Sequence, residues 1–98
     1  MSQSDEEFVR GVWKPVYRYQ SLSGVSMIQF GSHSLQTWEE AAAYTRERLE
    51  QIRQVEEEVE LIEGGLKEIL PTSTLDALER ILVREQAALA DLKRGMKQ

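Results

Sequence analysis

The sequence predicts an α+β fold that is mostly α: a short three-stranded antiparallel meander followed by an antiparallel hairpin of long helices, which dimerises into a four-helix bundle. Three observations predict this architecture. β-Branched and aromatic residues dominate 8–36. Apolar residues recur at alternating spacings of three and four over 52–69. The connector 71–74 is so short that the helices on either side of it must run antiparallel.

Composition limits the chain to one small structural domain without cysteine chemistry. It has 98 residues, of which 41% are hydrophobic and 30% charged, as in a folded protein rather than a disordered one. The absence of cysteine excludes disulfides, thiol nucleophiles and thiolate metal sites. Twelve basic against 17 acidic residues give a net charge of −5, which argues against a surface that grips phosphate backbones throughout.

The start of the chain is polar and acidic. Residues 1–7 contain no apolar residue after Met1, which predicts a flexible acidic arm. The string MSQSDEEF also lacks the basic and apolar regions of a secretory signal, and no apolar run approaches the roughly 18 residues of a membrane span. We therefore expect a cytoplasmic protein without a membrane partner.

The meander, 8–36, divides into three short strands separated by glycine turns. Glycine at the first central position of the pair Gly31-Ser32 suits a two-residue type II′ hairpin, and Gly24 lies in an earlier polar cluster. Pro15 cannot donate to a ladder, so the first strand begins after it or lies at an edge. The expected strands cover roughly 16–20, 25–30 and 33–36.

The helical hairpin, 37–98, begins with a capping box. Thr37 is followed by Glu40 three residues later, so the hydroxyl and the carboxylate each have a backbone amide to accept from. The heptad phase survives Gly64-Gly65, which favours one continuous or gently kinked helix that ends at Leu70-Pro71. Six consecutive seam positions follow the heptad: Ile52, Val55, Val59, Ile62, Leu66 and Ile69.

A second helix is expected over about 74–94. Ser73 with Asp76 resembles another capping arrangement, and Gly95 is the expected C-terminal stop. The polar Glu85 interrupts the seam of this helix, and Ile81 lies beside it. The apolar seam positions are Leu75, Leu78, Leu82, Leu89 and Leu92.

Two helices cover only one side of each apolar stripe, so the hairpin is expected to pair with a second copy as a homodimer. The alternative is that the strands fold back and cap a monomeric core. The expected oligomer interface is the set Ile52, Val55, Val59, Ile62, Leu66, Ile69, Leu78, Leu82 and Leu89.

The sequence offers few groups that could catalyse a reaction. His33 is the only histidine, and its neighbours Ser32 and Ser34 come without an acid in the same segment, so a nucleophilic triad is not indicated. Glu56 and Glu60 lie on adjacent turns of one helix, but no histidine follows at the spacing of carboxylate-bridged metal sites. We expect no enzyme activity, cofactor or metal.

Aromatic and basic residues interleave near the start of the meander. Tyr17 and Tyr19 share one face of the expected strand while Arg18 lies on the other, which weakens a base-stacking and phosphate-binding function. The aromatic residues either cover the start of the long helix or remain exposed for a protein partner. The expected partner-binding set is Trp13, Tyr17, Arg18 and Tyr19.

The layout over 26–49, a strand, a glycine turn, a Ser-Leu strand and then a capped helix, resembles small phage head-to-tail joining proteins. The resemblance implies a component of a virion or another large assembly, and no site residues are transferred from it. The favoured function is a non-enzymatic protein-binding or scaffolding module, an adaptor that self-associates through its helices as in a coiled coil. A nucleic-acid-associated protein that uses the basic, aromatic N-terminal half is the other alternative.

Overall fold

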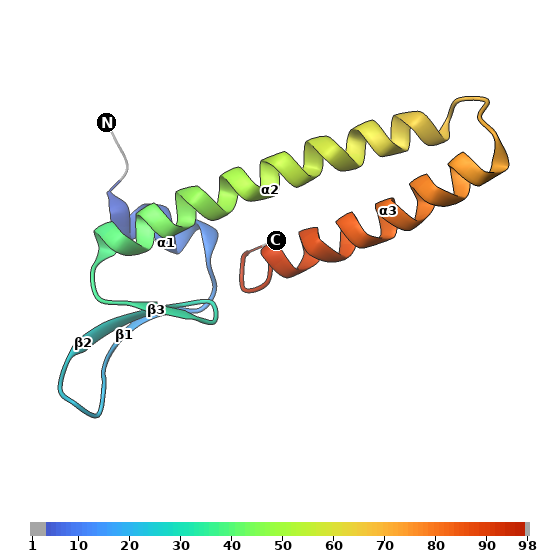
Figure 1. Cartoon of the computed structure of the whole chain (residues 1–98). Coiled ribbons are helices and arrows are strands. Elements are labelled where there is room, and N and C mark those ends of the chain that lie inside the picture. Colours follow the sequence, from blue (N-terminus) through green and yellow to red (C-terminus); the bar gives the residue numbers. More distant parts are fainter. Residues whose placement is uncertain (1–3, 98) are drawn as a thin grey trace. The chain divides into compact units, whose positions relative to one another are not determined.

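The computed structural model describes residues 4–97, which form three helices and one three-stranded antiparallel sheet (Figure 1). The predicted α+β, mostly helical class is confirmed. The chain divides into two compact units, which we call the sheet unit and the hairpin unit. The sheet unit comprises the residues up to Leu49 together with Arg94 and the residues after it, and the hairpin unit comprises Glu50–Lys93. The boundary between the two units falls inside the long helix.

The sheet is an antiparallel meander of β1 (Val16–Gln20), β2 (Ser26–Phe30) and β3 (His33–Leu35), in that order. Phe30 pairs directly with His33, so the loop between β2 and β3 has two residues. Gly31 occupies its first position with φ 60°, the positive value that primed hairpin turns require. The predicted strands and glycine loop are confirmed, with boundaries within one residue of those expected.

A short helix, α1 (Asp5–Val12), precedes the sheet and was not predicted. The expected arm included residues 5–7, which instead form the first turn of α1, and residues 1–3 lie outside the described part of the chain. The Ser4 hydroxyl accepts a hydrogen bond from the amide of Glu7 at 3.2 Å and so caps the helix. The acidic side chains of 5–7 stabilise the positive end of the helix dipole, which explains why this stretch folds.

The long helix α2 (Trp38–Leu66) begins at the predicted cap. The Thr37 hydroxyl accepts from the amide of Glu40 at 3.1 Å and also lies 3.1 Å from its carboxylate. The helix passes through Gly64 and Gly65 without a break but ends at Leu66, four residues before the predicted end at Leu70. The amides of residues 67 and 68 bond the carbonyls three residues back, as in a tightening last turn, because two glycines weaken the helix there.

The last helix, α3 (Thr72–Leu92), begins two residues before the predicted start. Pro71 occupies the N-cap, and no side chain caps the helix, so the predicted cap formed by Ser73 and Asp76 is wrong. Proline with φ −56° already has a helix-compatible dihedral, which lets the helix begin directly after it. Beyond the helix, Gly95 has φ 84° at the predicted stop.

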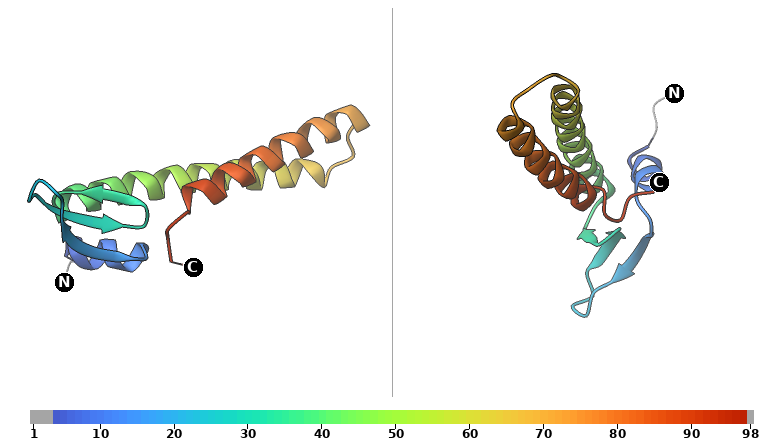
Figure 2. Two further views of the ribbon diagram at one scale, coloured as in Figure 1. Left: turned by 90° about the horizontal axis from the view of Figure 1, so that it is seen from below. Right: turned by 90° about the vertical axis from the view of Figure 1, so that its right-hand side faces the viewer.

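The core of the sheet unit lies between one face of the sheet and the helices α1 and α2 (Figures 1 and 2). Alternate residues of β2 point into this core, as the twofold period of a strand requires. Alanines at the start of α2 let that helix lie close to its neighbours. The buried apolar residues are Val9, Trp13, Ile28, Phe30, Ala41 and Ala42.

Candidate interaction surfaces

The apolar seam of the hairpin unit lies at the predicted positions of α2 and α3 but is only partly covered. Ile52 is 5% exposed, and it is the one buried residue across 50–93, all of which the structure describes. The remaining apolar seam positions that lie in the helices are half-buried: Val55, Val59, Ile62, Leu66, Leu75, Leu78, Leu82, Leu89 and Leu92.

Ile69 does not belong to this seam. It is 104% exposed, because α2 ends at Leu66 and the chain has already left the helical path. Its predicted place in the apolar stripe is therefore wrong, and the stripe on α2 runs from Ile52 to Leu66.

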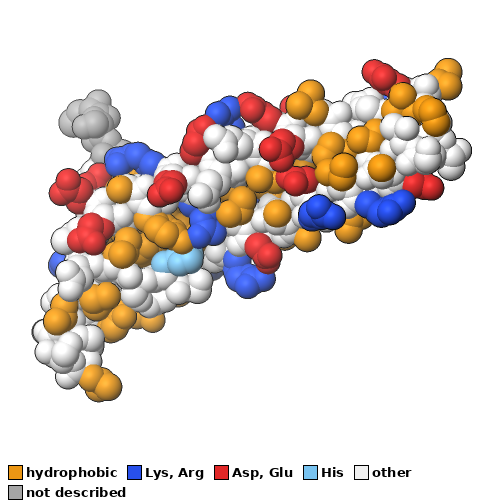
Figure 3. Space-filling view, in the orientation of Figure 1, with side chains coloured by type: hydrophobic (Ala, Val, Ile, Leu, Met, Phe, Trp, Pro, Cys, Tyr) orange, Lys and Arg blue, Asp and Glu red, His pale blue; other side chains and the backbone are white. Residues whose placement is uncertain are grey.

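Further large apolar side chains of the hairpin unit are exposed beside the seam. Leu61 is 77% exposed on α2, and on α3 Val83 is 67% and Ile81 40% exposed. Figure 3 shows hydrophobic side chains interspersed with acidic and basic ones over both helices. The hairpin unit therefore exposes several large apolar side chains outside its seam.

Two carboxyl groups meet at the polar position of the seam. A hydrogen bond to Glu58 is the main cause that raises the pKa of Glu85, with desolvation and the negative charge of Glu58 adding to it, while Arg84 acts in the opposite direction. One proton shared between two carboxyl groups relieves their repulsion. The predicted polar interruption of the seam is therefore a carboxyl pair between α2 and α3.

The outer face of the sheet presents two tyrosines. Tyr17 is 49% and Tyr19 36% exposed, and their ring centroids are 6.1 Å apart. The Tyr19 hydroxyl donates to Ser34 at 3.1 Å, and Ser34 in turn donates to the Gln29 side-chain oxygen at 2.6 Å. These bonds tie side chains of all three strands into one polar and aromatic face. Arg18 is exposed and pairs in register with the buried Ile28, so its side chain starts from the opposite face, as predicted.

Trp13 does not belong to that exposed face. It is 1% exposed, and its indole nitrogen donates to the Thr45 hydroxyl at 2.8 Å. Its ring meets Phe30 edge-on at 5.5 Å between centroids. The interpretation that aromatic residues cover the start of the long helix therefore holds for Trp13, whereas Tyr17 and Tyr19 remain exposed.

His33 lies in an aromatic cluster rather than in a catalytic arrangement. Its ring is 4.8 Å from that of Tyr44, whose hydroxyl lies 3.3 Å from His33 Nδ1 and accepts from the Arg48 guanidinium. Burial lowers the pKa of His33, and the positive charge of Arg48 lowers it further. The Ser34 hydroxyl is hydrogen-bonded to Tyr19 and Gln29, so Ser34 does not form a serine–histidine pair with His33.

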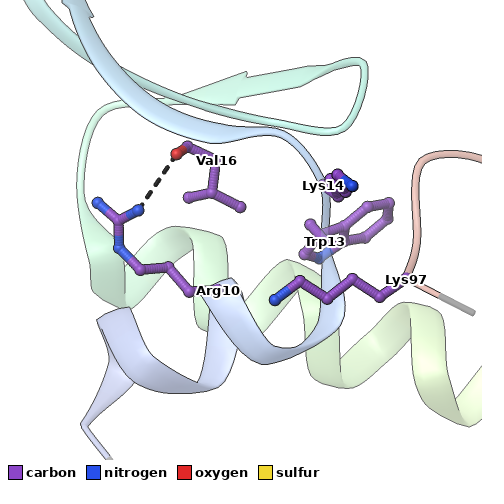
Figure 4. Close-up of a pocket in the computed structure, with 5 residues that line it drawn as sticks. All are labelled: Arg10, Trp13, Lys14, Val16 and Lys97. Carbon is purple, nitrogen blue, oxygen red and sulfur yellow. Dashed lines mark hydrogen bonds between the residues drawn. The ribbon is translucent and has the colours of Figure 1, made fainter.

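A cavity of about 650 Å³ in the sheet unit was not foreseen from the sequence. Three cationic residues, Arg10, Lys14 and Lys97, line it together with Trp13 and Val16 (Figure 4). An isolated bridge between residues 13 and 96 brings the end of the described chain to this place. No local pattern in the sequence indicates so distant a pairing, although Lys14 lies in the basic, aromatic N-terminal half that was considered for nucleic-acid binding.

Other kinds of site have less support in the described residues. No group of three or more histidine, aspartate or glutamate residues there is arranged to hold a metal ion, and Glu56 and Glu60 are exposed on α2. Within residues 4–97 no helix is both long and apolar enough to cross a membrane. Comparison with family models, with curated proteins and with solved structures gives no match to this chain.

Proposed function

We propose that the chain is a non-enzymatic interaction module that pairs with a second copy through the hairpin unit and offers the outer face of its sheet to a protein partner. One observation carries the first half of this proposal: across 50–93 a single residue, Ile52, is buried. Full burial of an aliphatic side chain contributes about 1.5–3 kcal/mol relative to exposure. Half-buried seam residues therefore leave much of that stabilisation to be gained on association.

A second hairpin is the occupant that best fits this seam. Two antiparallel hairpins form a closed four-helix core, and a twofold arrangement makes each stripe complementary to itself. The helices already follow heptad spacing, which is the pattern that interdigitates with a like partner. Ile81, 40% exposed beside the seam of α3, is placed to contribute to such an interface.

The sheet face is suited to a different partner. Tyr17 and Tyr19 offer large, amphipathic side chains whose conformations are limited to two torsions, and tyrosine is enriched in the dominant residues of protein interfaces. Because the Tyr19 hydroxyl is held by Ser34, less conformational freedom is lost on binding. A chain that pairs through its hairpin unit and binds a partner through its sheet face acts as a scaffold.

Light scattering coupled to size-exclusion chromatography tests the proposal. We expect twice the monomer mass at tens of micromolar, and a monomer for Val59→Asp, which places a charge on the seam. Val59→Asp can also unfold the hairpin itself, so Ile81→Asp is the second variant. Its control is Ala87→Asp, because residue 87 is exposed on a different face of α3.

The expected result for Ile81→Asp is a helical circular-dichroism spectrum like that of the parent with at least about tenfold weaker dimerisation. Ala87→Asp should dimerise as the parent does. A parent chain that stays monomeric, or equal effects of both aspartates, would contradict pairing through the seam.

A further inference from the structure

We propose that the cavity lined by Arg10, Lys14 and Lys97 binds a small molecule that carries a phosphate group. The chain has a net charge of −5, yet the described lining contains three cations and no carboxylate. A cavity of about 650 Å³ lies within the usual size of small-molecule sites. The inference is independent of dimerisation, since all the lining residues belong to the sheet unit.

The cavity is built by backbone pairing rather than by chance proximity of long side chains. The Lys14 amide donates to the Gly95 carbonyl at 2.9 Å, and the Lys97 amide donates to the Val12 carbonyl at 2.8 Å. These two bonds fix the backbone segments from which both lysines project. Two lysine side chains thus start from fixed backbone positions beside one cavity, where the repulsion between their charges favours a bound anion.

Arg10 is held in place on the same wall. Its Nε donates to the Glu6 carboxylate at 3.1 Å, and one terminal nitrogen donates to the Val16 carbonyl at 3.2 Å (Figure 4). The second terminal nitrogen bonds neither Glu6 nor Val16 and is available to donate to a ligand. Glu6 balances the charge of Arg10, so the two lysines supply the excess positive charge.

Figure 4 shows the Lys97 side chain extending below Trp13 toward Arg10. No described residue forms a salt bridge with the ammonium group of Lys14 or of Lys97. A phosphate group carries up to two negative charges and accepts hydrogen bonds from several donors at once. It therefore complements a guanidinium nitrogen and two ammonium groups better than a single carboxylate does.

The cavity also has an apolar side. Val16 is half-buried, and the edge of Trp13 forms part of the wall. The volume exceeds what an isolated phosphate ion fills, so the remaining space suits the organic part of a phosphate monoester or diphosphate. The chemical class assigned to the site is therefore a small phosphorylated organic molecule.

Titration of the full chain with sodium pyrophosphate at constant ionic strength tests this assignment, with amide chemical shifts from NMR as the readout. We expect saturable shifts at residues 10, 14 and 97, and much smaller ones with acetate. The double variant Lys14→Gln with Lys97→Gln should bind pyrophosphate at least about tenfold more weakly. Lys67→Gln, an exposed lysine of the hairpin unit, should bind as the parent does.

Other results would overturn the proposal. Absence of saturation up to about 10 mM pyrophosphate would do so. An equal loss of affinity in Lys67→Gln would show that net charge, and not this cavity, attracts the anion. Binding of a single-stranded oligonucleotide with no saturable pyrophosphate binding would assign the basic surface to nucleic acid instead. The same spectra show whether the double variant and Lys67→Gln keep the backbone bonds of the parent.

Discussion

The indole nitrogen of Trp13 donates a hydrogen bond of 2.8 Å to the hydroxyl of Thr45, and Thr45 donates in turn to the Ala41 carbonyl at 2.7 Å. Both residues of the first bond are buried, so the bond joins the end of α1 to α2 inside the core. A polar contact in such surroundings must be satisfied or it costs free energy. It therefore links the end of α1 to α2 through a satisfied polar pair in the core.

Replacing Thr45 tests the importance of this bond. Thr45→Val keeps the shape but removes the acceptor, leaving the Trp13 N–H buried without a partner. We expect the free energy of unfolding to fall by about 1–3 kcal/mol, measured by urea denaturation. Thr45→Ser, which keeps the hydroxyl, is the control, and an equal loss in both variants would show that packing of the methyl group dominates.

The tight approach of two glycines gives a second prediction. A Cβ at Gly31 would lie 2.8 Å from Trp13 Cε3, and one at Gly95 would lie 3.0 Å from the Gly31 Cα. Gly31→Ala therefore combines overlap with the strain of φ 60°. Gly24→Ala is the matched control, because its φ is 85° and nothing lies near its Cβ. We expect Gly31→Ala to lower the melting temperature clearly more than Gly24→Ala, whereas similar losses would contradict the close contact.

His33 makes the sheet unit sensitive to acid. Its pKa is lowered in the folded chain by burial and by Arg48, while the unfolded chain takes up the proton near pH 6.5. The unfolded state therefore binds more protons between these two values, and stability decreases as the pH falls through this window. Melting curves between about pH 5 and 8 should show this decrease in the parent, and it should be much smaller in His33→Gln.

Glu85 gives the opposite dependence in the hairpin unit. Its pKa is raised chiefly by the hydrogen bond to Glu58, so between about pH 4.5 and this raised pKa the folded state binds more protons than the unfolded chain. Stability should increase as the pH is lowered through the raised pKa of Glu85 and level off below 4.5. Glu85→Gln supplies a neutral donor, so we expect a higher melting temperature at pH 7.

The control for that experiment is Glu79→Gln, an exposed carboxylate elsewhere on α3. It changes the net charge by the same amount without touching the pair with Glu58. If both glutamines raise the melting temperature equally, relief of overall acidity and not the carboxyl pair is responsible.

Local patterns account for most of what the sequence predicted correctly. Gly31 marks its loop because few residues accept positive φ, and Thr37 with Glu40 marks the start of α2 because both groups act within one turn. The same reasoning was available for α1, where Ser4 is followed three residues later by Glu7. The β-branched and aromatic residues from Phe8 onward predicted strands there instead.

The bounds of the seam and the cationic cavity could not be predicted fully from local sequence patterns. The end of α2 at Leu66 reflects competition between a heptad pattern that favours continuation and two glycines, each of which costs about 1 kcal/mol relative to alanine. The cationic cavity depends on pairing between Trp13 and Met96, which neither periodicity nor spacing encodes. Burial of Trp13, rather than its exposure, follows from the same long-range arrangement.

The bridge from Trp13 to Met96 also has a consequence for how the chain folds. It closes a loop of roughly 80 residues, which is entropically costly and slow to find at random. Because α2 and α3 are neighbours in sequence, they can associate early and shorten the flexible part of that loop by about half, which lowers the cost of closure by about 0.6 kcal/mol. We therefore expect early formation of the hairpin to help the two ends of the sheet unit to meet.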